Sequence, residues 1–193
     1  MRPFHLVILA LALLAGSAGY VTHRWLRQDT APPPAGVAGP AVATVAASAD
    51  AAAAAPLDWR FPDADGREHR LGDLAGRVTV LNFWATWCPP CLREIPAFVA
   101  LQQEHREDGL QFIGIALDEP APVADFTAEK GINYPVLVGS NEVVRLMQAL
   151  GNAIGGLPYT VVLDASGEVV LTHQGEWAAE EAAAALGEFL KAP

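Results

Sequence analysis

Two cysteines, Cys88 and Cys91, carry the most informative chemistry in this sequence of 193 residues. Two prolines separate them, and the chain has no third cysteine. If a helix begins near Pro89, the two sulfur atoms lie about one turn apart and can come within bonding distance. Cys88 then faces the helix N-terminus, where free backbone N–H groups and the helix dipole stabilise a thiolate. The pair therefore predicts thiol–disulfide exchange.

The position of each cysteine predicts a separate role in that exchange. Cys88 is the expected attacking thiolate on a partner's disulfide. Cys91, further into the helix, then resolves the mixed disulfide and leaves an internal bond. Two other interpretations stay open from the residues alone. One is half of a metal site, although no histidine has ligand spacing with the pair. The other is an inert structural disulfide, although so short a loop constrains little of the unfolded chain.

Hydrophobic patterning indicates the elements that must position these cysteines. The run RVTVLNFW, residues 77–84, is typical of a central strand buried on both faces, and it ends just before the cysteine motif. Strands and helices then alternate, which predicts an α/β fold with a partly parallel sheet and an antiparallel edge. The expected order is hairpin (58–61 and 68–71), strand (77–84), helix (89–107), strand (110–117), helix (122–130), strand (134–138), helix (142–150), hairpin (159–163 and 168–172) and helix (177–190).

The overall composition excludes some functions and divides the chain into three parts. A net charge of −10, from 12 basic and 22 acidic residues, argues against a nucleic-acid partner. We expect a membrane anchor or signal segment at 1–28, a flexible linker at 29–56 and a single domain at 57–193. The linker prediction rests on residues 30–56, in which 13 of 27 residues are alanine and five are proline.

The N-terminal segment has more than one interpretation. Residues 6–21 carry no charge, a run slightly shorter than the roughly 20 residues that cross a bilayer. We favour an uncleaved transmembrane helix. A cleaved signal peptide remains open because small residues surround Ala18, and so does a buried soluble helix. The first two place the domain outside the cytoplasm, either tethered to the membrane or free in the periplasm.

The cysteine motif also carries a family resemblance. The run FWATWCPPC at 83–91, followed by Arg-Glu-Ile-Pro at 93–96, resembles the active site of thioredoxin-fold proteins. It is most similar to the membrane-tethered TlpA/ResA group of bacterial thiol-disulfide reductases, and the resemblance covers essentially all of 57–193. It implies a thioredoxin fold with an N-terminal hairpin and a central helix–strand insertion between 122 and 138. Pro96 matches the position where thioredoxins kink the active-site helix.

The resemblance also implies which residues meet a partner protein. Gly-Leu-Pro-Tyr-Thr at 156–160 resembles the cis-proline loop of the fold. Pro158 would then lie beside Cys88 and expose the backbone of Leu157 to an extended substrate segment. An ordinary trans turn proline is the alternative. Trp87 is expected on the docking face together with the prolines between the cysteines, Pro89 and Pro90, whereas Trp84 is expected in the core.

One departure from plain thioredoxin concerns the acid near the cysteines. Asn82 stands where thioredoxins carry a buried acid, and an amide cannot accept a proton from Cys91. The TlpA/ResA group instead places a glutamate after the next strand, and Glu119 matches that position. We expect Glu119 to be partly buried, with a raised pKa, and to serve as acid or base for Cys91. Asp118 is the second choice, and a solvated loop carboxylate is the competing interpretation of Glu119.

These features predict a periplasm-facing protein disulfide reductase of the bacterial inner membrane. By resemblance, its substrates include disulfide-bonded apocytochromes c and copper-site assembly proteins. A membrane thiol-relay protein supplies its electrons. No metal or dissociable cofactor is implied, because the Cys88–Cys91 pair is itself the redox centre. Three rivals stay open: a net disulfide oxidant, a copper-binding or copper-delivery module, and a holdase that uses the exposed face.

Overall fold

The computed structural model describes residues 55–191. The expected anchor at 1–28, and all but the last two residues of the expected linker at 29–56, lie outside this range. Within 55–191, no helix combines the length and apolar character that crossing a membrane requires.

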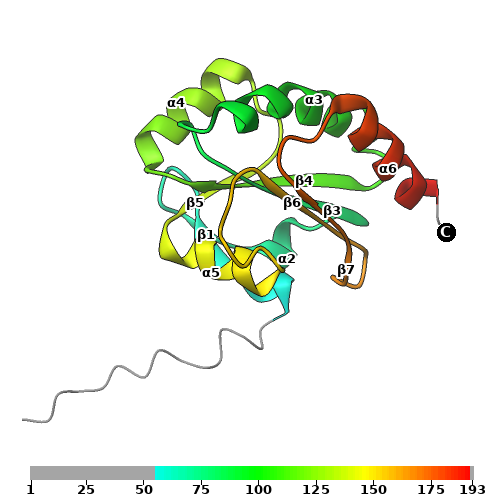
Figure 1. Cartoon of the computed structure of the whole chain (residues 1–193), viewed down its shortest axis with the longest axis horizontal. Helices are drawn as coiled ribbons and strands as arrows, with labels where there is room; N and C mark the ends of the chain where they lie inside the picture. Colours follow the sequence, from blue (N-terminus) through cyan, green and yellow to red (C-terminus); the bar gives the residue numbers. More distant parts are fainter. Residues whose placement is uncertain (1–54, 192–193) are drawn as a thin grey trace, which may run out of the picture. The chain divides into compact units, whose positions relative to one another are not determined.

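The described chain forms a five-stranded sheet with helices on both faces (Figure 1). The strand order is β5-β4-β3-β6-β7; β3, β4 and β5 run parallel, whereas β6 and β7 complete the sheet as an antiparallel hairpin. A separate two-stranded hairpin, β1–β2, is joined to β5 by a bridge between Asp63 and Leu137. The elements are η2 (Pro56–Asp58), β1 (Arg60–Pro62), β2 (Glu68–Arg70), α2 (Leu71–Leu74), β3 (Val78–Trp84), α3 (Pro89–His105), β4 (Leu110–Leu117), α4 (Pro120–Lys130), β5 (Val136–Gly139), α5 (Asn141–Ala149), β6 (Tyr159–Leu163), β7 (Val169–Gln174) and α6 (Ala179–Lys191).

The central strand β3 explains how the sheet supports the site. All seven of its residues are buried, because strands flank it on both sides and helices cover both faces. Successive side chains of a strand point to opposite faces. Leu81 accordingly packs in the core on the α5 side, and Val80 packs in the core on the α3 and α6 side. The strand ends at Trp84, so its carboxyl end delivers the chain directly to the cysteine motif.

Helix ends follow local sequence signals. Helix α4 begins at Pro120, where a proline costs no hydrogen bond because the first N–H groups have no partner in the helix. It ends at Gly131, whose φ of 63° lies in the left-handed region that glycine adopts without a Cβ clash. The expected helix–strand insertion is therefore confirmed, with a start two residues earlier than expected.

Two further boundaries differ from the sequence prediction at residues that are buried. The strand expected at 68–71 ends at Arg70, and Leu71 instead opens a one-turn helix and is fully buried. The last helix begins at Ala179 rather than at Trp177. Trp177 precedes the helix, and its backbone N–H donates to a buried side chain of α3.

Candidate functional site: a disulfide at the N-terminus of a helix

The two cysteines form a disulfide across the first turn of α3. Cys88 is the N-cap residue and Cys91 lies in the first turn, with 5.3 Å between their Cα atoms. Pro89 and Pro90 occupy the first two helical positions, where no backbone N–H is needed. The predicted helix start and the predicted pairing are both confirmed. When the bond is reduced, Cys88 faces the positive end of the helix dipole, which favours its thiolate form.

The two sulfur-bearing residues differ in their access to the surface. Cys88 keeps 5% of its surface exposed, whereas Cys91 keeps none. Both belong to a core cluster that includes Trp84 and Ile95, so Trp84 is a packing residue, as predicted. A partner can therefore approach Cys88, while Cys91 is shielded behind it.

Large apolar side chains are exposed directly before Cys88 and in the loop before Leu157. Trp87, directly before Cys88, is 64% exposed, which fits the predicted docking role. Pro89 is exposed and Pro90 half-buried. A second large apolar residue, Ile154, is 89% exposed in the loop that leads to the 156–160 segment.

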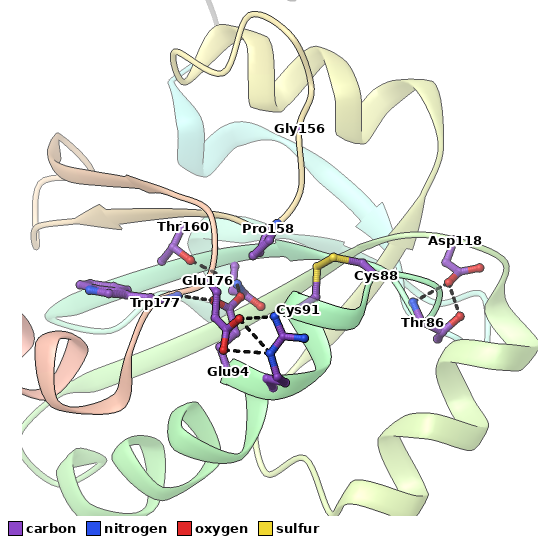
Figure 2. Close-up of a disulfide and its surroundings, with 12 residues drawn as sticks. Thr86, Cys88, Cys91, Glu94, Asp118, Gly156, Pro158, Thr160, Glu176 and Trp177 are labelled. Carbon is purple, nitrogen blue, oxygen red and sulfur yellow. Dashed lines mark hydrogen bonds and ion pairs between the residues drawn. A yellow bond between two sulfur atoms is a disulfide. The ribbon is translucent and has the colours of Figure 1, made fainter.

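The Leu157–Pro158 peptide bond is cis, as the resemblance implied. Figure 2 draws Pro158 beside the disulfide, and Leu157 packs against the cluster that contains both cysteines. Asn152 holds the backbone of this loop at Gly156. Its side chain donates to Gly156 O at 2.7 Å and accepts from Gly156 N–H at 3.3 Å. Within the described residues, the N–H and C=O of Leu157 make no hydrogen bond. Both groups are therefore free to pair with an extended peptide.

A carboxylic acid that the sequence reasoning did not select lies beneath the disulfide. Glu94 is 2% exposed and sits three residues after Cys91 on α3 (Figure 2). Its Oε1 accepts from Asn82 Nδ2 at 2.8 Å, and its Oε2 accepts from the backbone N–H of Trp177 at 2.9 Å. Burial, only partly offset by these hydrogen bonds, raises the pKa of Glu94 to about 7.

Asp118 has a structural position at the rim of the site. Its Oδ2 accepts from the backbone N–H of Thr86 at 2.8 Å and from the Thr86 hydroxyl at 2.6 Å (Figure 2). Partial burial opposes ionisation of Asp118, but the bonds from Thr86 outweigh it and lower its pKa. Asp118 thus remains charged and ties the end of β4 to the loop before Cys88.

Glu119 differs from its expected environment. It is exposed, not partly buried, because it is the N-cap residue of α4 and turns away from the core. It lines a surface pocket of about 300 Å³ together with Trp87 and Asp118. The prediction of a partly buried Glu119 is wrong, while its part in catalysis stays a prediction.

Comparison with known proteins places this geometry in a family. The Redoxin family model matches residues 36–186. The chain belongs to the Redoxin family. Relatives of this Redoxin include the thiol-disulfide oxidoreductase ResA of Geobacillus thermodenitrificans, 34% identical over 113 residues, which cover 58% of this chain and 63% of the relative. ResA of Bacillus thuringiensis subsp. konkukian is 30% identical over 131 residues, 67% of this chain and 70% of the relative. The resemblance to TlpA/ResA-like proteins is thereby confirmed.

Solved structures agree with the fold of this Redoxin. A thiol:disulfide interchange protein of the thioredoxin family from Chlorobium tepidum matches with a TM-score of 0.62 and 31% identity, covering 68% of this chain and 92% of the other. A thioredoxin-related protein from Neisseria meningitidis matches with a TM-score of 0.59 and 29% identity, covering 67% and 97%. The predicted thioredoxin fold is therefore confirmed for the described domain.

Of two residues that the sequence analysis did not select, Glu94 had a signal in the sequence and Ile154 had none. Glu94 lies three positions after Cys91 and four before Phe98, both of which face the core, so a helical pattern already places it on the buried side. Ile154 carries no such signal, since an isolated apolar residue in a loop is ordinary. Among residues 55–191, no group of three or more His, Cys, Asp or Glu side chains is arranged to hold a metal.

Proposed function

We propose that this protein is a thiol–disulfide oxidoreductase that reduces disulfides of partner proteins outside the cytoplasm. The observation that carries the proposal is the unequal access of the two cysteines: Cys88 borders the surface at a helix N-terminus, and Cys91 is buried behind it. This arrangement allows attack by one sulfur and resolution by the other. The free backbone of Leu157 offers a partner segment a place to pair.

The proposed reaction begins from the reduced dithiol. The Cys88 thiolate attacks one sulfur of the partner's disulfide, and the other partner sulfur leaves as a thiolate. Cys91 then loses its proton and attacks the Cys88 sulfur. The mixed disulfide breaks, the partner leaves with two reduced sulfurs, and the Cys88–Cys91 bond forms. Two electrons pass from the dithiol to the partner, and two protons balance the partner's new thiols.

We assign to Glu94 the role of accepting the proton of Cys91 when Cys91 attacks the mixed disulfide. It lies one helical turn from Cys91 in a buried pocket. An acid or base works best when its pKa is near the operating pH, and burial raises the pKa of Glu94 to about 7. Glu119, in contrast, is exposed and lines a surface pocket beside Trp87.

The cellular setting follows from the family and from the N-terminal sequence. We propose that residues 1–28 tether the domain to the inner membrane facing the periplasm, with a cleaved leader as the alternative. The partners are disulfide-bonded extracytoplasmic proteins of the cytochrome c maturation or copper-site assembly type. A membrane thiol-relay protein returns the disulfide to the dithiol form. The match to ResA of Geobacillus thermodenitrificans covers 63% of that relative, and it supports the redox chemistry of this domain. The identity of the partners is inferred from the family resemblance alone.

A trapping experiment tests this function. Full-length protein carrying Cys91→Ala is expressed in a bacterial periplasm, and thiols are quenched with acid before non-reducing electrophoresis. Cys88 should accumulate mixed disulfides with specific partners, whereas the Cys88→Ser/Cys91→Ala control should accumulate none. Recovery of no adduct would contradict the proposal. A Cys88–Cys91 pair that is mostly oxidised at steady state would favour a net oxidant, and stoichiometric Cu(I) binding without disulfide reduction would favour a copper module.

A further inference from the structure

Two consecutive residues of α3 contact two consecutive residues of the loop between β7 and α6. Arg93 donates from Nε to both carboxylate oxygens of Glu176, at 3.1 and 2.9 Å, and from Nη2 to one of them. Glu94, the next residue, accepts the backbone N–H of Trp177 at 2.9 Å. Figure 2 shows Glu176 and Trp177 reaching α3 at this point. We call these two adjacent contacts the α3–loop ladder.

The two rungs of the ladder lie in different environments. The outer rung is open to solvent, with the side chains of Arg93 and Glu176 exposed by 59% and 38%. The inner rung is closed, because Glu94 and Trp177 are 2% and 3% exposed. Glu176 and Trp177 are consecutive residues. A change in the Arg93–Glu176 contact therefore moves the backbone N–H of Trp177, which donates to Glu94.

The charges around Glu94 give the outer rung a second effect. The negative charge of Glu176 disfavours ionisation of Glu94 and contributes to its raised pKa. Arg93 is bound to Glu176 and offsets that charge. From the sheet side, Glu94 faces the neutral Asn82 of β3. Burial, and after it the charge of Glu94, raise the pKa of Tyr134. Arg93 is therefore the cation that counters the anion whose charge disfavours ionisation of Glu94.

We propose that the Arg93–Glu176 ion pair positions Glu94. The ion pair holds the Trp177 N–H against the Glu94 carboxylate, and Arg93 cancels the charge of Glu176. The inference rests on the proposed role of Glu94 in proton transfer. Neither Arg93 nor Glu176 reacts with the partner; they act through Glu94. A surface ion pair of this kind adds little stability by itself, so its effect should be seen in the titration of Glu94.

The test is a carboxyl titration of the oxidised, full-length protein by NMR with ¹³C-labelled glutamate. The Glu94 signal is assigned by its loss in Glu94→Gln. Arg93→Gln leaves Glu176 uncompensated and should raise the midpoint of Glu94 by about half a pH unit or more. Arg93→Gln/Glu176→Gln removes both charges, so its midpoint should fall back toward that of the native protein. Amide hydrogen exchange at Trp177 should become at least several-fold faster in both variants, because the Arg93–Glu176 ion pair no longer holds the neighbouring Trp177 N–H in place.

A matched control breaks a similar ion pair elsewhere. Arg145→Gln removes the partner of Glu142 on α5, a surface pair that does not touch Glu94. It should leave the Glu94 midpoint and the Trp177 exchange rate unchanged. If Arg93→Gln behaves like this control in both measurements, the positioning role is refuted. Because the titration needs no substrate, it is independent of the trapping experiment: a shifted midpoint without trapped partners upholds the ladder and rejects the proposed function.

Discussion

Asn82 on β3 donates from Nδ2 to Glu94 Oε1 across 2.8 Å, so an amide and a carboxylate share one fully buried pocket. The same Nδ2 lies 3.2 Å from the hydroxyl of Thr160, while Oδ1 of Asn82 has no protein partner within residues 55–191. The amide carries no charge. Glu94 is therefore the acid of this pocket, supplied by the helix and not by the strand.

The buried acid makes stability depend on pH. Burial raises the pKa of Glu94 from 4.5 to about 7, so the folded protein binds this proton more tightly than the unfolded chain. The resulting stabilisation is complete below about pH 4.5 and is lost as the pH rises to about 7. Relative to Glu94→Gln, the native protein should lose about 3 kcal/mol of unfolding free energy over that window. Urea unfolding of both oxidised proteins at pH 4.5, 6 and 8 measures it.

A glutamate elsewhere on α3 is the control for that measurement. Glu104 is exposed near the end of the helix, so Glu104→Gln should give the same pH dependence as the native protein. A difference between native and Glu94→Gln proteins that stays constant from pH 4.5 to 8 would contradict the buried, titrating acid.

Replacing the amide by an acid tests why β3 carries Asn82. Asn82→Asp places two carboxyl groups in one pocket, and like charges this close cannot both ionise cheaply. At pH 8 the variant should be less stable than the native protein by about 2–4 kcal/mol, and the gap should narrow at pH 5. Asn82→Asp/Glu94→Gln moves the single acid to the strand and should recover most of the loss. No recovery in this double variant would count against charge repulsion as the cause.

The part of the site that could be predicted from sequence is the part set by local spacing. The Cys-Pro-Pro-Cys run after a buried strand is enough to place Cys88 at the helix N-terminus. Helical spacing places Glu94 on the buried side of α3, but its hydrogen-bond partner Trp177 lies 83 residues away and could not be predicted from local spacing. The burial of Glu119 was predicted wrongly because a position after β4 does not determine burial. Only tertiary packing decides whether a side chain at that position turns toward the core.

The choice between the two glutamates can be made by kinetics. We expect Glu94→Gln to slow resolution of a mixed disulfide about 10- to 100-fold and to abolish the inflection near pH 7 in its rate. Glu119→Gln should keep that inflection. The measurement is stopped-flow release of a thiol from a preformed Cys88 mixed disulfide between pH 5 and 9. The reverse pattern, with the inflection lost only in Glu119→Gln, would restore Glu119 as the catalytic acid.

The exposed Ile154 should contribute to recognition of protein substrates. Ile154→Ser removes an exposed apolar side chain three residues before Leu157 and should raise KM for a protein disulfide about 3- to 10-fold with little change in kcat. Reaction with a small aromatic disulfide should be unaltered. Val169, 43% exposed at the far end of β7, supplies the control, and Val169→Ser should change neither rate. Equal loss toward both substrates in Ile154→Ser would indicate damage to the cysteines rather than to docking.

The Asp118–Thr86 contact should support the loop that carries Cys88. Asp118→Ala leaves the partly buried N–H and hydroxyl of Thr86 without their acceptor, so we expect a loss of about 1–3 kcal/mol of unfolding free energy. Asp125→Ala, at an exposed position of α4, should cost far less. Thermal unfolding of the oxidised proteins checks this. Similar melting temperatures for the two variants would show that the contact is dispensable.

In the proposed reaction, the buried Cys91 ends the covalent complex from within the same chain. The thiol that ends a mixed disulfide is held on the same helix as Cys88, so release requires no collision with a second molecule. The partner's concentration then sets how often an encounter begins, but not how long it lasts. On the proposed mechanism, the lifetime of the covalent complex is therefore set by α3 and its buried acid, and it should be the same in a dilute compartment as in a crowded one.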